Sequence, residues 1–452
     1  MHYAATNYSS SIANCPLLII FATNNIDMHE DFLHFIYKNR LWIEGTELLT
    51  DNTPFEIIDT GLHNHDSGPD FFNAKIRIGN ITHVGNVEIH VNASDWHKHH
   101  HDGDHAYDNV ILHVVYNSDC DITLQNGRTL PTWEISFPQA IFNRYSDFKL
   151  NEKPIACTDY IDLVDDFHIT MWMEKMAVER LEYKSEHISE ILQHTNGNWN
   201  ETLYIVIARN FGFGTNALPF EMLAMQTPLS VMLHNADNLF ALEAITFGQA
   251  GMLNGQPNDE YTRNLATEYS FQKAKYNLSP IAESLWKRSK MHPTNFPETR
   301  LAQFAALMQN FQIIIDDILN DRFNPKVFDN LKTSEYWETH FSLGETSSKQ
   351  KATKLGQQAI DTIMINTVIP FSYIYGKTTN PNFDSEKIID MLRAVKAESN
   401  RETRAFSDVC KIKCESAFDS QALLNLKKNY CDHKRCLNCN IGFQIMKEIN
   451  KI

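Results

Sequence analysis

Hydrophobic positions in the first third of the chain change from helical spacing to strand alternation. Phe32, Phe35, Ile36 and Leu41 recur at roughly helical spacing and predict a helix over residues 30–42. Period-two alternation and short apolar runs then predict strands over residues 54–59, 71–78, 83–91, 110–116, 122–124 and 133–137. The polar stretch 94–108 separates the third strand from the fourth and predicts a short helix. Helix, three strands, helix and strand indicate an α/β core with a mixed sheet over residues 28–150.

Helical spacing dominates the next part of the chain, residues 151–400, with predicted helices such as 171–192, 201–210 and 300–319. Glycine and proline punctuate these segments, as at 211–214. The predicted fold class is therefore α+β: an α/β core followed by a mostly α-helical domain. A short segment, residues 401–452, follows it and is rich in cysteine and basic residues.

Composition narrows the class of protein. The chain has 452 residues, of which 43% are hydrophobic and 21% charged, as in soluble globular proteins. Its 40 basic and 56 acidic residues give a net charge of −16, which disfavours nonspecific coating of nucleic acid. The longest early apolar run, residues 16–22, is too short for a membrane span and follows no basic region. We expect a cytoplasmic protein with no membrane contact and a disordered extension over residues 1–27.

Two carboxylates are predicted to meet on the sheet. Side chains alternate along a strand, so Glu88 and His90 share one face of the strand 83–91. Asp70 begins the preceding strand, and a hairpin turn near residues 79–82 brings its carboxylate beside Glu88. Adjacent carboxylates repel each other unless a cation lies between them. Oxygen ligands of this kind suit Mg²⁺ or Mn²⁺, which can activate water for attack on a phosphodiester.

Ten of the 20 histidines lie between residues 63 and 113, many of them just beyond these carboxylates. His99 and His101 alternate as metal ligands do, and Asp104 and Tyr107 follow them. His113, on the next strand, either points toward the carboxylates or is an ordinary core histidine. This segment predicts either a second group of metal ligands or a solvated polar turn.

The arrangement resembles the PD-(D/E)XK nuclease superfamily, whose restriction-endonuclease-like core has the same order of elements. Pro69-Asp70 matches its first motif and Glu88-Ile89-His90 its second, except that His90 replaces the expected lysine. The resemblance implies catalysis by Asp70, Glu88 and His90 with Mg²⁺ or Mn²⁺. The histidine leaves two alternatives: a nuclease in which His90 acts as the base, or an inactive relative that serves as a scaffold or binding protein. A third hypothesis is a hydrolase that uses His99, His101 and Asp104 as transition-metal ligands.

A longer set of motifs resembles a bacterial family classified as a domain of unknown function, DUF2851. The motifs are G-P-D-F from Gly68, V-E-I-H from Val87, residues 243–251, residues 295–300 and residues 430–442. This resemblance covers nearly the whole chain from Met28 and implies no particular activity.

Five of the eight cysteines lie in the last segment, which predicts a metal site. Cys431, Cys436 and Cys439 supply three thiolates, and the fourth ligand is Cys410, Cys414 or His433. Such spacing favours Zn²⁺, with an iron–sulfur cluster as the alternative. Cys15, Cys120 and Cys157 are interpreted as structural or incidental.

The same segment carries a local charge of +4, from ten basic and six acidic residues. Lys427, Lys428, Lys434 and Arg435 surround the cysteine loop and form a basic patch that can contact nucleic-acid phosphates.

Overall fold

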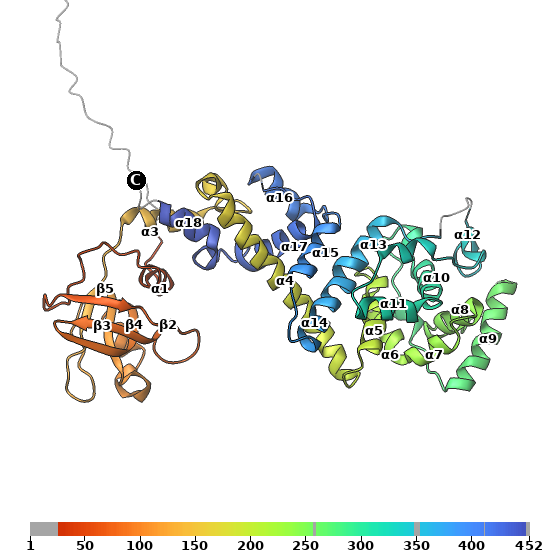
Figure 1. Cartoon of the computed structure of the whole chain (residues 1–452), viewed down its shortest axis with the longest axis horizontal. Coiled ribbons are helices and arrows are strands. Elements are labelled where there is room, and N and C mark those ends of the chain that lie inside the picture. Colours follow the sequence, from red (N-terminus) through yellow and green to blue (C-terminus); the bar gives the residue numbers. More distant parts are fainter. Residues whose placement is uncertain (1–25, 256–258, 348–352, 411, 449–452) are drawn as a thin grey trace, which may run out of the picture. The chain divides into compact units, whose positions relative to one another are not determined.

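The computed structural model describes residues 26–255, 259–347, 353–410 and 412–448 (Figure 1). The chain divides into two compact units, with boundaries after Glu152 and after Gln444. We call them the sheet unit, which runs up to Glu152 and also includes the residues from Ile445 on, and the helical unit, Lys153–Gln444, and describe each by itself. The prediction for residues 1–27 and Cys15 falls almost entirely outside the described residues.

A mixed sheet forms the centre of the sheet unit. Its strand order is β1-β3-β4-β5-β6, and a short strand, β2, also pairs with β3. The antiparallel pairs are β1 with β3, β2 with β3 and β3 with β4, whereas β4 with β5 and β5 with β6 are parallel. The strands are β1 (Phe55–Asp59), β2 (Leu62–His63), β3 (Phe71–Ile78), β4 (Ile81–Asn92), β5 (Val110–Asn117) and β6 (Thr132–Glu134). The α+β class and the mixed sheet are thus confirmed.

The crossover between the parallel strands β4 and β5 consists of three short helical turns. These are α2 (Asp95–Lys98), η1 (His101–Gly103) and η2 (His105–Tyr107). Trp96, Tyr107 and Val110 pack in one buried apolar cluster, which also includes Ile122, Leu124 and Leu130. This cluster holds a polar, histidine-rich segment firmly against the sheet.

Two longer helices lie before and after the strands along the chain of this unit. Helix α1 (Glu30–Lys38) contacts β4, and α3 (Gln139–Leu150) follows β6. Phe32 of α1 stacks on Tyr145 of α3 with ring centroids 5.0 Å apart. Helix α1 ends at Lys38, before the predicted residue 42, because Arg40 adopts a left-handed conformation with φ of 55°.

The predicted strand 122–124 is wrong. This segment makes only an isolated bridge between Thr123 and Thr129, because the turn at Gly127 returns the chain before a ladder can form. Sequence reasoning also missed α3 and β2.

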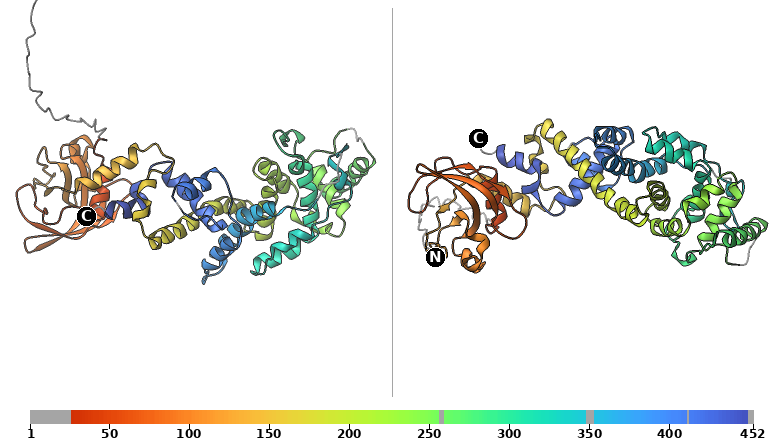
Figure 2. Two further views of the ribbon diagram at one scale, coloured as in Figure 1. Left: turned by 90° about the horizontal axis from the view of Figure 1, so that it is seen from above. Right: turned by 60° about the horizontal axis from the view of Figure 1, so that its bottom comes forward.

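The helical unit is built around the long helix α4 (Asp166–His194), which packs against α14 (Ile369–Thr379) and α17 (Ala417–Leu426) (Figures 1 and 2). Its other helices are α5 (Trp199–Phe211), α6 (Ala217–Gln226), α7 (Leu229–His234), α8 (Leu239–Gln249), α9 (Glu260–Tyr276), α10 (Pro297–Met308), α11 (Phe311–Leu319), α12 (Tyr336–Thr339), α13 (Gln357–Ile363), α15 (Glu386–Ala394), α16 (Arg401–Val409) and the start of α18 (Asn440–Glu448). A small hairpin, β7 (His340–Ser342) and β8 (Glu345–Thr346), interrupts them.

The helix predicted over residues 300–319 is two helices, α10 and α11, separated at Gln309 and Asn310. Across the described residues, no helix combines the length and apolar character needed to cross a bilayer.

Candidate functional site

The site begins with two buried polar side chains on β4. Glu88 is 5% exposed and His90 1%, and strand alternation points both to the same face of the sheet. Burying such groups is costly unless they have partners. Their partners come from the crossover that follows β4 and from the neighbouring strand β5.

The crossover contributes His99 and His101. His99 Nδ1 lies 3.1 Å from His90 Nε2, and the intervening His100 has a left-handed conformation with φ of 63°. His90, His99 and His101 each offer a ligand atom, and these three atoms lie within 4.8 Å of one another. It is the one group of three such donors found among the described residues.

Glu88 contacts two of these histidines through one carboxylate oxygen. Its Oε1 lies 3.2 Å from His101 Nε2 and 3.5 Å from His90 Nε2. His101 Nε2 is buried, yet it forms no hydrogen bond of proper geometry with any described residue. The other oxygen, Oε2, accepts a hydrogen bond of 3.1 Å from the Asp70 backbone N–H. Glu88, His90, His99 and His101 are hereafter called the histidine site.

Three contacts within the histidine site have the spacing of metal ligands, and Glu88 takes part in two of them without belonging to the group whose atoms all lie within 4.8 Å of one another. Ligand atoms around a tetrahedral ion with bonds of about 2.1 Å lie about 3.4 Å apart. The three short contacts within the site are 3.1, 3.2 and 3.5 Å. Imidazole is a ligand of Zn²⁺, Mn²⁺ and other transition metals rather than of Mg²⁺.

His113 supports the site from behind. It is fully buried on β5, in register with Glu88, and its Nε2 lies 2.8 Å from His90 Nδ1. A histidine that donates from Nδ1 to such a partner keeps Nε2 free as a ligand, which is the usual second-layer contact in metal centres. The structure places His113 against His90 rather than against a carboxylate, as a fully buried histidine of the sheet.

Asp70 lies beside Glu88, as predicted from the hairpin. The Asp70 carboxylate, however, contacts groups other than Glu88. Asp70 Oδ2 accepts a hydrogen bond of 2.8 Å from the Ile89 N–H and lies 3.2 Å from His34 Nε2 of α1. Glu30, one turn before His34, interacts electrostatically with both Asp70 and His99. Sequence reasoning missed Glu30 and His34. Their i, i+4 spacing on a predicted helix was the available signal, because it places both side chains on one face of that helix.

Burial and mutual repulsion shift the ionisation of this group. Burial, together with the charge of Asp70, raises the pKa of Glu88 to about 9. Burial, together with the surrounding histidines, lowers the pKa of His90 to about 2, and burial lowers that of His113 to about 3. A bound cation would favour the ionised form of the buried carboxylate and would bind the neutral imidazoles beside it.

The remaining predicted residues of this segment play other roles. Asp104 Oδ1 accepts a hydrogen bond from the Ala106 N–H at 2.9 Å and so caps η2, and Asp104 is not among the three donors that lie together. Tyr107 stacks on His101 with ring centroids 3.8 Å apart and positions that ring.

The C-terminal cysteines lie in the helical unit. Cys431 ends the π-helical turn η8 (Lys427–Cys431), Cys436 begins η9 (Cys436–Asn438), and Cys439 immediately precedes α18. Burial, together with the neighbouring thiols, raises the pKa of Cys157, which is interpreted from sequence as structural or incidental, well above its ordinary value. Two members of the predicted basic patch are engaged within the protein: Lys427 pairs with Asp432, and Lys428 lies over the Tyr183 ring at 5.2 Å.

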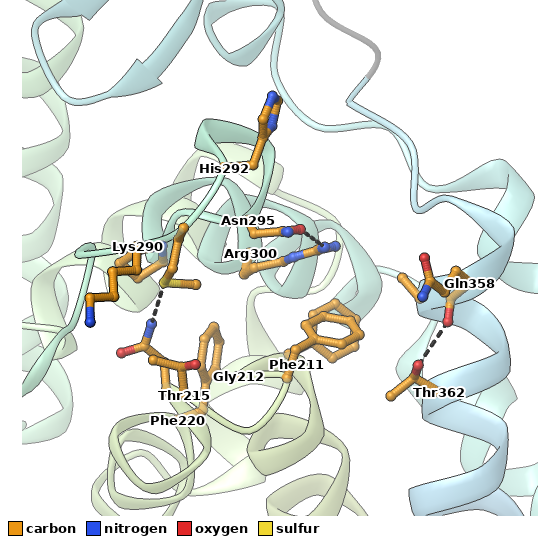
Figure 3. Close-up of a pocket in the computed structure, with 15 residues that line it drawn as sticks. Phe211, Gly212, Thr215, Phe220, Lys290, His292, Asn295, Arg300, Gln358 and Thr362 are labelled. Carbon is orange, nitrogen blue, oxygen red and sulfur yellow. Dashed lines mark hydrogen bonds between the residues drawn. The ribbon is translucent and has the colours of Figure 1, made fainter. Parts of the chain in front are cut away.

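The helical unit also contains a cavity of about 350 Å³ between α5, α10 and α13 (Figure 3). Arg300 faces this cavity, stacks over the Phe213 ring at 4.2 Å and donates a hydrogen bond of 2.6 Å to Asn295 Oδ1. Burial lowers the pKa of Arg300 to about 10. Because Asn295 and Gln303 already hold the guanidinium, the cavity is a weaker candidate for chemistry than the histidine site.

Fold and geometry together describe an α+β protein whose mixed sheet carries a cluster of histidines and carboxylates, joined to a helical unit. The chain belongs to the DUF2851 family, described as a protein of unknown function, whose model matches residues 30–401. The match begins at the first residue of α1 and includes the whole histidine site, whereas the motif predicted at residues 430–442 lies beyond it. No curated protein and no solved structure shows a significant match to the chain.

Proposed function

We propose that this protein is a metal-dependent phosphodiesterase of the nuclease class, in which Glu88, His90, His99 and His101 bind one transition-metal ion. The observation that carries the proposal is the group of three imidazoles whose ligand atoms lie within 4.8 Å of one another, with a carboxylate oxygen 3.2 and 3.5 Å from two of them. The donor set favours Mn²⁺ or Zn²⁺ over the Mg²⁺ suggested by the carboxylates alone.

Access to the site supports a catalytic rather than a closed structural centre. His90 is buried and His101 half-buried, but His99 is exposed, so one side of the group faces solvent. Catalytic metal sites keep such an open position for water or substrate, whereas structural sites are closed by protein ligands. A divalent ion bound here supplies Lewis acidity and lowers the pKa of a water molecule.

The chain's own residues supply the other parts of a hydrolytic site. His113 fixes the ring of His90, and the Asp70 backbone N–H holds Glu88 Oε2, so that Oε1 points to the histidines. The Asp70 carboxylate contacts His34 and raises the pKa of that imidazole above its ordinary value, against the opposing effect of burial. His34 is then a proton donor for the leaving oxygen of a phosphodiester.

The test is cleavage of labelled single-stranded, duplex and branched DNA and of RNA, with Mn²⁺, Zn²⁺ or Mg²⁺ supplied separately. Glu88→Gln removes the charged ligand with little change in volume. His97→Gln is the matched control, because His97 is exposed and pairs with Asp102 at 2.7 Å, away from the site. We expect metal-dependent cleavage by wild type and His97→Gln, and a loss of more than about 100-fold in Glu88→Gln. Equal cleavage by the three proteins would refute the proposal.

A binding or scaffold protein without catalysis is the second candidate. It is favoured by His90, which stands where the nuclease pattern has lysine, and by the net charge of −16. Wild type that binds Mn²⁺ through the histidine site and cuts none of these substrates would support it.

A further inference from the structure

Arg300 of α10 is a partly buried cation in the helical unit. A guanidinium has five N–H donors, and two of those of Arg300 are used, by Gln303 Oε1 at 2.9 Å and by Asn295 Oδ1 at 2.6 Å. The Arg300 Nε is buried and has no hydrogen-bond partner within the described ranges of the chain. Both acceptors are neutral amides, so these hydrogen bonds leave the positive charge of Arg300 without a counter-ion.

Two other partly buried arginines of the same unit differ from Arg300 in this respect. Arg209 Nη1 lies 2.6 Å from Glu221 Oε2. Arg288 Nη2 lies 2.8 Å from Glu298 Oε1. Both carboxylates are buried, and each offsets the charge of its arginine. Because a charge that is removed from water is costly unless it is paired, an anion from solution would complete the surroundings of Arg300.

The guanidinium of Arg300 is held in a fixed position. Gln303 is 2% exposed, and its Nε2 donates a hydrogen bond of 2.9 Å to the Thr353 carbonyl, which turns Oε1 toward Arg300. The guanidinium also stacks over the Phe213 ring at 4.2 Å. Phe213 has a left-handed conformation with φ of 42°, which is costly for a bulky residue and is typical of ligand sites. A cation held in this way loses little freedom when it binds an anion.

Arg300 faces the cavity of about 350 Å³ described above, which lies near the lower end of the range of roughly 300–1,000 Å³ for small-molecule sites (Figure 3). Fifteen described residues line this cavity, and none of these is acidic, although the chain has 56 acidic residues. Phe211 and Phe220 give it apolar walls. Lys290 and His292 are exposed and point away from Arg300 in Figure 3, so they contribute positive charge at the rim rather than direct contacts.

This lining indicates the chemistry of the ligand. Guanidinium groups bind phosphates and carboxylates through paired N–H donors. A phosphomonoester carries a charge of about −1.5 to −2 at pH 7, which matches the two formal positive charges of Arg300 and Lys290 better than a single carboxylate does. The phenylalanine walls favour a ligand whose phosphate is attached to a largely apolar ring.

We propose that this cavity binds a phosphomonoester with a flat, largely apolar body, such as a nucleoside monophosphate, whose phosphate pairs with Arg300. The segment 295–300 then has a role: it begins with Asn295 and ends with Arg300, and no residue of it belongs to the histidine site. The proposal does not depend on the phosphodiesterase activity proposed above, since the two sites share no residue.

The first test is calorimetric titration of full-length wild type with AMP, UMP and phenyl phosphate, compared with adenosine, inorganic phosphate and benzoate. At least one of the three esters should bind once per chain and at least about tenfold more tightly than the three comparison compounds. Absence of binding by all three esters at millimolar concentration would overturn the proposal. Equally tight binding of benzoate would overturn the choice of a phosphate, and equally tight binding of inorganic phosphate would overturn the requirement for an organic body.

Variants locate the binding site. Arg300→Gln should weaken binding of the ester about 10- to 100-fold, because it removes the charged donor. Arg322→Gln is the matched control and should bind as wild type does, since Arg322 is an exposed arginine of the same unit that lies 3.7 Å from Asp317. Ala359→Phe should also abolish binding, because it fills the cavity from α13 while leaving Arg300 in place. Equal affinity in Arg300→Gln and wild type would refute the assignment.

Hydrogen exchange of wild type, measured by mass spectrometry with and without saturating ester, tests the location without any variant. Exchange should slow in peptides that cover residues 211–216 and 290–303. Slowing confined to other peptides would contradict the proposed site, whether or not the variants fold. His99→Ala should bind the ester as wild type does, which separates this result from the outcome of the phosphodiesterase assay; loss of binding in His99→Ala with full binding in Arg300→Gln would place the ester at the histidine site and refute the proposal.

Discussion

Replacing His99 should abolish stabilisation of the sheet unit by a transition metal while leaving the metal-free protein intact. His99 is exposed, so His99→Ala removes little packing, yet it takes away one of the three converging imidazoles. The neighbouring His97→Ala is a matched control, because His97 is also exposed but pairs with Asp102 instead. The two variants therefore differ in the metal ligand and hardly at all in burial.

The size of the effect follows from linkage between binding and unfolding. Mn²⁺ at 100 times its Kd stabilises the folded state by about 2.7 kcal/mol. If loss of His99 weakens binding about 100-fold, the same Mn²⁺ concentration contributes only RT ln 2, or about 0.4 kcal/mol. In a unit the size of residues 26–152, 1 kcal/mol of stability changes the Tm by about 3 °C. The difference of about 2.3 kcal/mol therefore corresponds to roughly 7 °C in Tm.

The assay is differential scanning calorimetry with and without Mn²⁺, following the transition that responds to the metal. Wild type and His97→Ala should shift upward by about 8 °C, and His99→Ala by about 1 °C. An equal shift in His99→Ala would refute the assignment of His99 as a ligand.

Three further predictions concern other parts of the fold. His113→Leu should weaken Mn²⁺ binding about 10- to 100-fold in calorimetric titration, because His90 loses the partner that orients its ring; unchanged affinity would contradict that role. Gly248→Ala should lower the free energy of unfolding in urea by about 1–3 kcal/mol, since its new Cβ would stand 2.1 Å from the Tyr269 ring, and an unaltered midpoint would count against this packing. Burial, with the nearby Arg180 charge, lowers the pKa of Lys184 to about 7, below its unfolded value near 10.4. Between these two pH values the unfolded chain binds more protons than the folded chain, so the free energy of unfolding rises with pH. Lys184→Met should flatten this rise by up to about 1.4 kcal/mol per pH unit, measured by denaturation at a series of pH values. An unchanged slope would contradict the prediction.

Much of the sheet could be predicted from residue pattern alone. The strand predicted over residues 71–78 coincides with β3, because apolar and polar side chains alternate from Ala74 to the turn at Gly79, although a bulge with Asn73 at a φ of 57° interrupts the pairing near the start of the strand. The strand predicted over residues 122–124 is wrong, because three residues of strand pattern do not indicate whether a partner strand is present. The split of residues 300–319 into α10 and α11 was missed because apolar spacing continues through the break.

The site was predictable only in part. Strand alternation placed Glu88 and His90 on one face, and the structure agrees. The approach of His99 and His101 depends on a left-handed residue, His100, within a chain of short turns, and local pattern does not specify such a path.

The central claim is that three histidines and a carboxylate bind one transition-metal ion in the sheet unit. X-ray absorption at the manganese edge tests it most directly, on full-length protein loaded with one equivalent of Mn²⁺, a metal that cysteine thiolates bind poorly. The account predicts outer-shell scattering from about three imidazoles, falling to about two in His99→Ala. A spectrum fitted by oxygen ligands alone, identical in wild type and variant, would contradict it.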